Sequence, residues 1–187
     1  MIGDGRVTRL RGRPLWRPTC DHSPRLVERL VGMPLPPVVM TGFDGPLNLS
    51  DFPMNAPRVI YLYPGASTSP DDGDSSPLMD VLEHRAFRDH QPDLEAMGSR
   101  AFGVSSQSLE SQLQILVDHA IPPRQLLRDT KLHLASELGL ATFMLNGARW
   151  YHRLTLIAIN GEIVKAWATN PARTAAQGVA WLQLRGT

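Results

Sequence analysis

Residues 58–90 decide the fold, and they read RVIYLYPGASTSPDDGDSSPLMDVLEHRAFRDH. The segment VIYLY (59–63) carries β-branched and aromatic residues on both faces, which is typical of a central strand covered on both sides. A Pro-Gly pair ends this strand, and a polar loop (66–76) follows. A helical pattern then runs over 77–97. We expect the rest of the chain to be arranged around this strand–loop–helix junction.

The helical pattern has an apolar stripe with two interruptions. Pro92 should kink the helix or split it in two, and Gly98 should end it. The stripe recurs at the three- and four-residue spacing of one helix face. Its members are Leu78, Val81, Leu82, Ala86, Phe87, Leu94 and Met97.

The chain beyond Gly98 alternates between strand and helix patterns. We expect Ser108 to cap the second helix, whose inward residues would be Leu109, Leu113, Leu116 and Val117. Asn160-Gly161 between two apolar strands strongly predicts a hairpin. The expected elements are a strand at 99–106, a helix at 108–120, a strand at 124–129, a helix at 131–140, an insertion-like connector at 141–152, a hairpin at 153–168 and a helix at 171–184.

The N-terminal third adds a hairpin and an arm. Asp44-Gly45 lies between two apolar runs in 33–53, which predicts a hairpin turn. Residues 1–33 contain seven arginines and form a basic arm. Within it, 23–32 has the pattern of a short helix; a flexible arm and an arm packed on a partner subunit are the alternatives. We therefore expect an arm (1–33) and one domain (34–187).

Composition excludes several classes of protein. The 187 residues suffice for one core, and 19 basic against 18 acidic side chains give no field for nucleic acid. Cys20 is the only cysteine, so we expect no intrachain disulfide and no cysteine cluster for a metal. No apolar run is long enough for a bilayer, and the N-terminus resembles no secretion signal. We predict a cytoplasmic protein without a metal or other cofactor.

The order of elements favours an α/β fold with a mixed central sheet flanked by helices. Four segments resemble the peroxiredoxins, the alkyl hydroperoxide reductase and thiol-specific antioxidant superfamily, and are most similar to its bacterioferritin-comigratory branch. These segments are LNLSDF…RVIYLYP (47–64), FRDHQPDLEAMGSRAFGVSSQSLESQ (87–112), LLRDTKLHLASELGL (126–140) and RLTLIAINGEIVKAW (153–167). The resemblance covers about 34–184 and implies a thioredoxin-like fold with an N-terminal hairpin and arm.

The resemblance also implies a cysteine that this sequence does not have at the expected place. The family carries its peroxidatic cysteine eight residues before the arginine of Phe-Arg-Asp, and counting back from Arg88 reaches Asp80. Counting forward along the family pattern Pro-x-x-x-Thr-x-x-Cys, from Pro64 and Thr68, reaches Asp71 instead. We favour Asp80, because residue spacing along a helix varies less than the length of a loop. A carboxylate cannot form the sulfenic acid of a thiol peroxidase.

The resemblance also implies that an arginine, here Arg153, points at the active-site pocket that Asp80 would occupy. This pair allows two interpretations. In the first, the two form an ion pair that closes a vestigial site. In the second, the pocket is retained and catalyses another reaction. Asp80 would then orient His84 and raise its basicity, as an acid–base pair four residues apart on one helix face. Arg153 would hold an anionic or carbonyl oxygen. The alternative for His84 is a solvated side chain.

Aromatic and loop residues complete the predicted site. Tyr63, Trp150 and Tyr151 would line an apolar wall, unless they are core residues. Pro64 and Thr68 would contribute to substrate binding through the family pattern. The histidines have no metal-ligand spacing.

Three functions stay open. The leading hypothesis is a cysteine-independent enzyme acting on a small molecule, for example in a biosynthetic pathway. The second is a non-catalytic scaffold or partner-binding protein that docks through its arginine-rich arm. The third assigns thiol redox work to Cys20, which would reach the pocket or link two subunits. Because peroxiredoxin relatives often form dimers, we also expect a homodimer, with neither nucleic acid nor membrane as partner.

Overall fold

The computed structural model describes residues 24–53, 55–65, 77–168 and 171–186. Its centre is a seven-stranded mixed sheet in the order β2-β1-β5-β4-β3-β8-β9, and β6 and β7 form a separate two-stranded sheet. The strands are β1 (Val39–Gly42), β2 (Gly45–Asn48), β3 (Arg58–Leu62), β4 (Arg100–Ser105), β5 (Leu126–Arg128), β6 (Thr142–Leu145), β7 (Ala148–Tyr151), β8 (Leu154–Ile159) and β9 (Glu162–Trp167).

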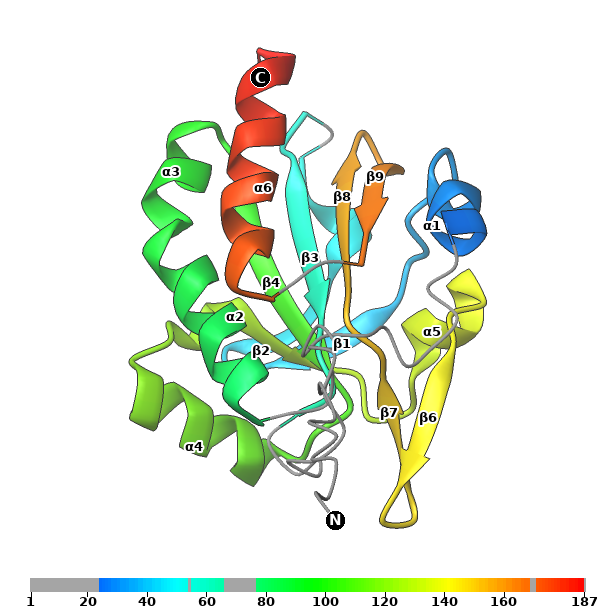
Figure 1. The fold of residues 1–187 in the computed structure, drawn as a ribbon, viewed down its shortest axis with the longest axis vertical. Coiled ribbons are helices and arrows are strands. Elements are labelled where there is room, and N and C mark those ends of the chain that lie inside the picture. The colour runs from blue at the N-terminus through cyan, green and yellow to red at the C-terminus, as the bar shows by residue number, and fades with distance from the viewer. Residues whose placement is uncertain (1–23, 54, 66–76, 169–170, 187) are drawn as a thin grey trace, which may run out of the picture.

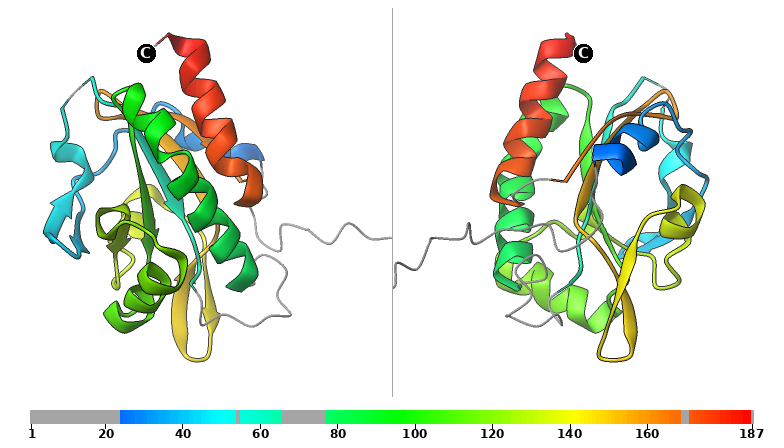
Figure 2. Two further views of the ribbon diagram at one scale, coloured as in Figure 1. Left: turned by 90° about the vertical axis from the view of Figure 1, so that its left-hand side faces the viewer. Right: turned by 45° about the vertical axis from the view of Figure 1, so that its right-hand side comes forward.

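Helices cover both faces of the central sheet, as Figures 1 and 2 show. One face carries α2 (Pro77–Asp89), α3 (Gln91–Ala96), α4 (Leu109–His119) and α6 (Pro171–Arg185). The other face carries α1 (Pro24–Leu30) and α5 (His133–Leu138). Two short 3-10 helices lie at Leu49–Asp51 and Pro123–Gln125. This arrangement confirms the predicted α/β fold with a thioredoxin-like mixed sheet.

The strand β3 is central, as predicted. It is parallel to β4 and antiparallel to β8, and all five of its residues are buried. Its side chains alternate between two hydrophobic cores, because successive strand residues point to opposite faces. Val59 and Tyr61 join the core under α2, α3, α4 and α6, whereas Ile60 and Leu62 join the core under α1 and α5.

Both predicted hairpins are present. Asn160 and Gly161 have positive φ angles of 55° and 76°, as a tight two-residue turn between twisted strands requires. In the first hairpin Gly42 pairs with Gly45, so the turn residues are Phe43 and Asp44, one position earlier than expected.

The connector predicted at 141–152 is wrong, because this segment forms the β6–β7 hairpin. Asn146 and Gly147 make its turn, with φ angles of 51° and 77°. The same Asn-Gly dipeptide predicted the later hairpin correctly. The earlier one was missed because its strands are half-exposed and lack the apolar density of a central strand.

The inward face predicted for α4 is also largely wrong. Leu109, Leu113 and Val117 are 42%, 44% and 77% exposed, and Leu116 is the one predicted residue that is buried. Gln112 is buried beside it, because its side-chain amide serves polar groups of the core, described below. Because Gln112 faces inward, the most apolar face of α4 is turned away from the core. In α2 the first residue of the predicted stripe, Leu78, is likewise 61% exposed.

Part of the predicted arm packs on the domain. The predicted short helix is present as α1, which ends in the fully buried Leu30. Gly32 donates to the carbonyl of Ile163 on β9, and Ile163 donates back to Met33, both at 2.8 Å. Residues 1–23 lie outside the described residues, so the division of the chain at 33/34 remains a prediction.

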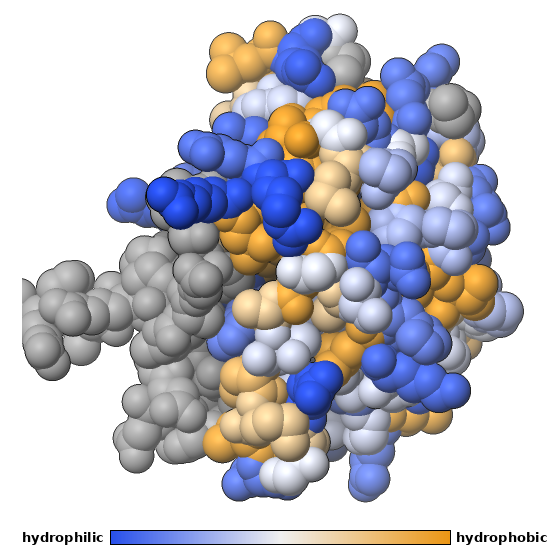
Figure 3. Space-filling model, turned by 90° about the vertical axis from the view of Figure 1, so that its right-hand side faces the viewer, coloured by the Kyte–Doolittle hydropathy of each residue, from blue (hydrophilic) through white to orange (hydrophobic). Residues whose placement is uncertain are grey.

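The face that carries α1 and α5 has apolar residues scattered among polar ones (Figure 3). Within the described ranges, no helix is long and apolar enough to cross a membrane. The same ranges contain no group of three or more histidine, cysteine or acidic residues arranged to hold a metal ion.

Candidate functional site

Helix α2 directs ionisable side chains into the protein. Asp80, Glu83, His84 and Phe87 recur at the spacing of one helix face, and none of them is more than 2% exposed. The alternative that His84 is a solvated surface side chain is therefore wrong. Tertiary partners decide the buried face here, because each polar side chain finds partners on the sheet beneath.

Arg153 reaches this face from a distant part of the chain. Leu62 at the end of β3 pairs with Leu154 at the start of β8, so Arg153 lies at the carboxyl end of β3, beneath the first turns of α2. Its Nη1 donates to Oε2 of Glu83 at 2.7 Å, and its Nη2 donates to Oδ1 of Asp80. The guanidinium thus bridges two carboxylates of α2. We call Asp80, Glu83 and Arg153 the acid–arginine triad.

The triad is shielded from water, since the side chains of its three members are only 2–3% exposed. Burying a charge is unfavourable unless it is paired and hydrogen-bonded, and two charge-assisted bonds to one guanidinium meet that requirement. Removing one partner of a buried ion pair typically costs about 3–5 kcal/mol, because the other charge stays buried. The fold therefore depends on the triad being complete.

Two tyrosines, Tyr61 on β3 and Tyr63 directly after it, surround His84. The hydroxyl of Tyr61 lies 3.2 Å from Nδ1 of His84, and the ring of Tyr63 meets the imidazole edge-on with ring centroids 4.4 Å apart. Tyr61 also stacks on Phe87 at 4.1 Å. Gly103 on β4 makes room for this arrangement, because a Cβ there would come within 2.5 Å of the Tyr61 ring. A close packing of aromatic rings fixes the histidine.

Burial keeps the side chains of His84, Tyr61 and Tyr63 uncharged near neutral pH. It lowers the pKa of His84 to about 3, and the positive charge of Arg153 adds to that effect. Burial also raises the pKa of Tyr61 and of Tyr63 well above the ordinary value for a phenol. We expected Asp80 to raise the basicity of His84, but the pKa of His84 is lowered by desolvation and by the nearby guanidinium.

Gln112 ties the site to the sheet. Its Nε2 donates to the hydroxyl of Tyr63 at 3.1 Å, to the hydroxyl of Ser105 at 3.3 Å and to the carbonyl of Leu127 at 3.1 Å. One buried amide therefore joins β4, β5 and the residue that follows β3 at the end of the sheet that carries the site. This explains why α4 turns Gln112 inward.

The other predicted site residues are distributed as follows. Pro64 follows Tyr63 and is buried with it. Tyr151 contributes to the opposite core, and its hydroxyl donates to Asp129 at 2.6 Å. Trp150 is half-buried and donates from its indole nitrogen to the carbonyl of Leu145 in the β6–β7 hairpin. Thr68, Asp71 and Cys20 lie outside the described residues.

Sequence reasoning missed three members of the site: Glu83, Tyr61 and Gln112. Glu83 carried a usable signal, since it lies three residues after Asp80 and one before His84, on the same helix face. Tyr61 was recognised only as a strand residue. Nothing local distinguishes Gln112, because its partners come from three separate parts of the chain.

Comparison with known proteins gives the fold its name. No family model matches the sequence, and no curated protein does. Solved structures match at low identity. Peroxidoxin BcpB from Mycobacterium tuberculosis is 19% identical, with a TM-score of 0.68 over 82% of this chain and 96% of that chain. The fold is that of a peroxiredoxin.

Two further structures agree. A PrxQ variant from Xylella fastidiosa is 19% identical, with a TM-score of 0.68 over 84% of this chain and 97% of that one. The bacterioferritin comigratory protein from Xanthomonas campestris is 20% identical, with a TM-score of 0.64 over 80% and 92%. The peroxiredoxin scaffold therefore spans most of the chain, which itself has a single cysteine, Cys20.

Proposed function

We propose that this chain is a peroxiredoxin-scaffold protein without the peroxidatic thiol, and that it serves as a non-catalytic scaffold or partner-binding protein. Phe87-Arg88-Asp89 sets the register of α2, and eight residues before Arg88 stands Asp80. A carboxylate there cannot be oxidised to a sulfenic acid and reduced again by a thiol.

The acid–arginine triad is the observation that carries this proposal. An arginine positioned to act on a substrate needs donors that can turn to a ligand. Here two guanidinium nitrogens of Arg153 donate to Glu83 and Asp80, within a group that is almost fully buried. A ligand entering this place would have to separate a buried ion pair. The triad supports a structural role for the former centre.

The proposal is tested by peroxide consumption, with hydrogen peroxide or cumene hydroperoxide as oxidant and dithiothreitol as reductant. The natural chain and a Cys20→Ser variant should both match the rate without protein. The bacterioferritin comigratory protein from Xanthomonas campestris, which is described as having alkyl peroxide reduction activity, serves as the positive control for the assay. Rapid turnover by the Cys20→Ser variant would refute the proposal. If the natural chain consumes peroxide and the Cys20→Ser variant does not, the peroxidase activity belongs to Cys20.

Partner binding is assigned to the arginine-rich N-terminal segment, and the partner we propose is a second copy of the chain. Residues 24–33 pack on the domain, so a deletion should stop at residue 23. Sedimentation of the full chain should give a dimer, and the chain shortened by residues 1–23 should give a monomer. A full chain that sediments as a monomer at about 100 µM would contradict this part of the proposal.

A cysteine-independent enzyme acting on a small molecule is the second candidate. It is favoured by one observation: Nε2 of the buried His84 has no hydrogen-bond partner among the described residues. A neutral imidazole with an unused nitrogen could exchange a proton with a substrate. Asp80 and Arg153 would then be catalytic, and this requires that the site open.

Histidine modification by diethyl pyrocarbonate, read by mass spectrometry, separates the two candidates. His133, whose side chain is 57% exposed, provides the internal control. Under the scaffold proposal His133 is modified at least about 100-fold faster than His84, since His84 reacts only when the protein opens. Similar rates for the two histidines would favour the enzyme.

A further inference from the structure

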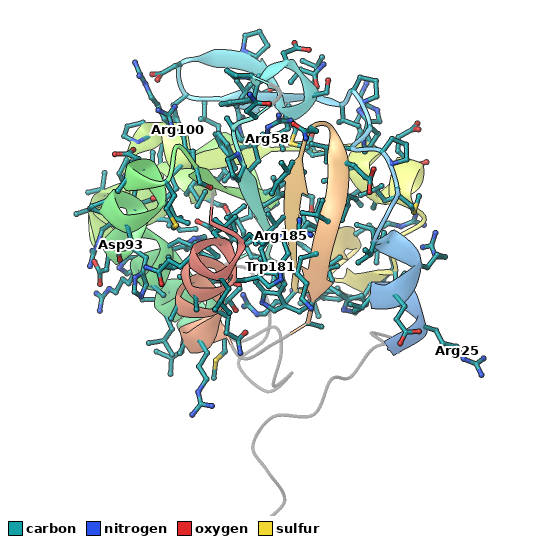
Figure 4. All side chains as sticks on the ribbon, turned by 90° about the horizontal axis from the view of Figure 1, so that it is seen from above. Arg25, Arg58, Asp93, Arg100, Trp181 and Arg185 are labelled. Atoms are coloured by element: carbon teal, nitrogen blue, oxygen red, sulfur yellow. The ribbon has the colours of Figure 1, made fainter. Side chains whose placement is uncertain are left out.

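A cleft lies at the opposite end of the sheet from the acid–arginine triad. The triad lies where β3 ends, whereas Arg100 begins β4 beside Arg58, the first residue of β3. The cleft has a volume of about 350 Å³ and is bounded by α3, the start of β4, the 3-10 helix Pro123–Gln125 and Asp44 of the first hairpin turn. Figure 4 shows this end, with Arg100 between the helices and the hairpin.

A second hollow of about 230 Å³ adjoins the cleft and shares Asp44, Arg100 and Arg124 with it. Its wall is largely apolar and includes Phe43, Phe52 and Phe102. The two hollows together are large enough for a molecule of a dozen or so non-hydrogen atoms.

Gln125 in the cleft wall has an unsatisfied amide. The residue is only 4% exposed, and neither its Nε2 nor its Oε1 has a hydrogen-bond partner in the part of the chain that the structure describes. Leaving a buried amide unpaired costs about 1–3 kcal/mol, and folded proteins rarely tolerate it without a reason. Because Gln125 lines the cleft, its amide is an unpaired donor and acceptor beside the space that a ligand would fill.

The charges around Gln125 are balanced. Arg100 is exposed and makes no ion pair with the described residues, while Nε of Arg124 lies 2.7 Å from Oδ2 of Asp44. Glu95 accepts a hydrogen bond from Gln91 at 2.9 Å, which leaves its other carboxylate oxygen available. Two cations and two anions line the cleft. A ligand with a large net charge would therefore be repelled by the two side chains of the same sign.

We propose that this cleft binds a short zwitterionic peptide of about dipeptide size. Its carboxylate pairs with Arg100, its ammonium group with Glu95, and its peptide amide with the side-chain amide of Gln125. Ala101, Pro122 and Pro123 supply an apolar wall for one of its side chains. This site is independent of the proposed function, because it shares no residue with the triad.

Binding is measured by calorimetric titration of the full chain with L-alanyl-L-leucine, for which a Kd of about 1 mM is expected for a ligand of this size. N-acetylated alanyl-leucine and alanyl-leucinamide each lack one terminal charge and should bind at least about fivefold more weakly. Adenosine monophosphate is titrated as the competing candidate, because its base can bind a side-chain amide and its phosphate can pair with an arginine. If it binds more tightly than the dipeptide, the proposal is overturned.

Variants separate a ligand site from a structural one. Gln125→Leu is close in volume and should weaken dipeptide binding at least about tenfold while keeping or raising the thermal midpoint, because it removes the unpaired amide. Arg100→Gln should weaken binding by a similar factor, and Arg25→Gln on α1 is the matched control and should bind as the natural chain does.

Further outcomes of these titrations and variants overturn the proposal. One is a lack of saturable binding of alanyl-leucine at about 20 mM. Another is binding by the Gln125→Leu variant that equals that of the natural chain. A lowered midpoint in Gln125→Leu would likewise overturn it, since it would give the amide a structural role.

Discussion

The buried acids on the two faces of the sheet, Asp129 on one face and Asp80 with Glu83 on the other, are stabilised in different ways. Asp129 accepts hydrogen bonds from the backbone nitrogens of His133 and Leu134 at 2.9 and 2.8 Å and from the hydroxyl of Tyr151 at 2.6 Å. Asp80 and Glu83 instead share the guanidinium of Arg153, which lies 73 and 70 positions away in the sequence. One acid is stabilised by neutral donors, mostly nearby in the chain, and the other two by a remote charge.

The difference has a physical consequence. Donors from the start of α5 are fixed by the helix itself, so the environment of Asp129 forms together with local structure. The triad forms only when β8 has paired with β3 and α2 has docked on both. Its partners are mutually dependent, and losing one leaves charge without water around it. The following predictions test this contrast.

The largest effect is expected from Arg153→Met, which removes the bridging cation and keeps much of its volume. The free energy of unfolding should fall by about 3–5 kcal/mol, because two carboxylates remain buried without it. Chemical denaturation at pH 7 measures the change. The exposed Arg25 provides the matched control, and Arg25→Met should alter stability by less than about 0.5 kcal/mol. A loss below about 1 kcal/mol in the Arg153 variant would break the contrast.

An intermediate effect is expected from Asp129→Ala. The variant loses the acceptor for two helix N–H groups and for Tyr151, and stability should fall by about 2–3 kcal/mol. Tyr151→Phe removes only one of the three donors and should cost about 1 kcal/mol. The same denaturation experiment applies. If Tyr151→Phe cost as much as Asp129→Ala, the local backbone donors would not be the main support of this carboxylate.

A pH effect comes from His84. Its pKa is about 3 in the folded protein and 6.5 in the unfolded chain, so between these values only the unfolded chain binds the proton. Stability is therefore fully present above pH 6.5 and falls as the pH drops below it, by up to about 1.4 kcal/mol per pH unit. Unfolding at pH 7 and at pH 5 should differ by up to about 2 kcal/mol more in the natural chain than in His84→Gln. Equal slopes would contradict the burial of a neutral imidazole.

The smallest effect is expected at an exposed ion pair. Asp44 and Arg124 lie 2.7 Å apart, but their side chains are 59% and 74% exposed. Arg124→Gln should therefore change the free energy of unfolding by less than about 1 kcal/mol. A loss as large as that of Arg153→Met would mean that burial does not distinguish the two arginines.

The sequence predicted most of the elements, with the β6–β7 hairpin as the exception, but it did not predict their polar faces. The central strand 59–63, the split at Pro92 and the Asn160-Gly161 turn follow from local patterns, and each of them is present. Asp80 and Arg153 were brought together only by resemblance to a family, because no local pattern connects residues so far apart.

What failed depends on tertiary partners. The apolar spacing of α4 predicted Leu113 and Val117 as inward residues, yet the helix turns Gln112 inward to meet Tyr63, Ser105 and Leu127. Likewise, the charges of Glu83 and His84 suggested a solvated surface, since residues of these types are rarely buried unless they are paired. Such pairs become visible only once strands from distant parts of the chain are placed side by side.

We propose above that the triad has a structural role, in which its buried charges stabilise one another. This role is tested most directly by comparing Arg153→Met with a chain that carries Asp80→Asn, Glu83→Gln and Arg153→Met together. Without buried charges, the triple variant should recover at least half of the stability that the single variant loses. A triple variant no more stable than Arg153→Met would contradict the account.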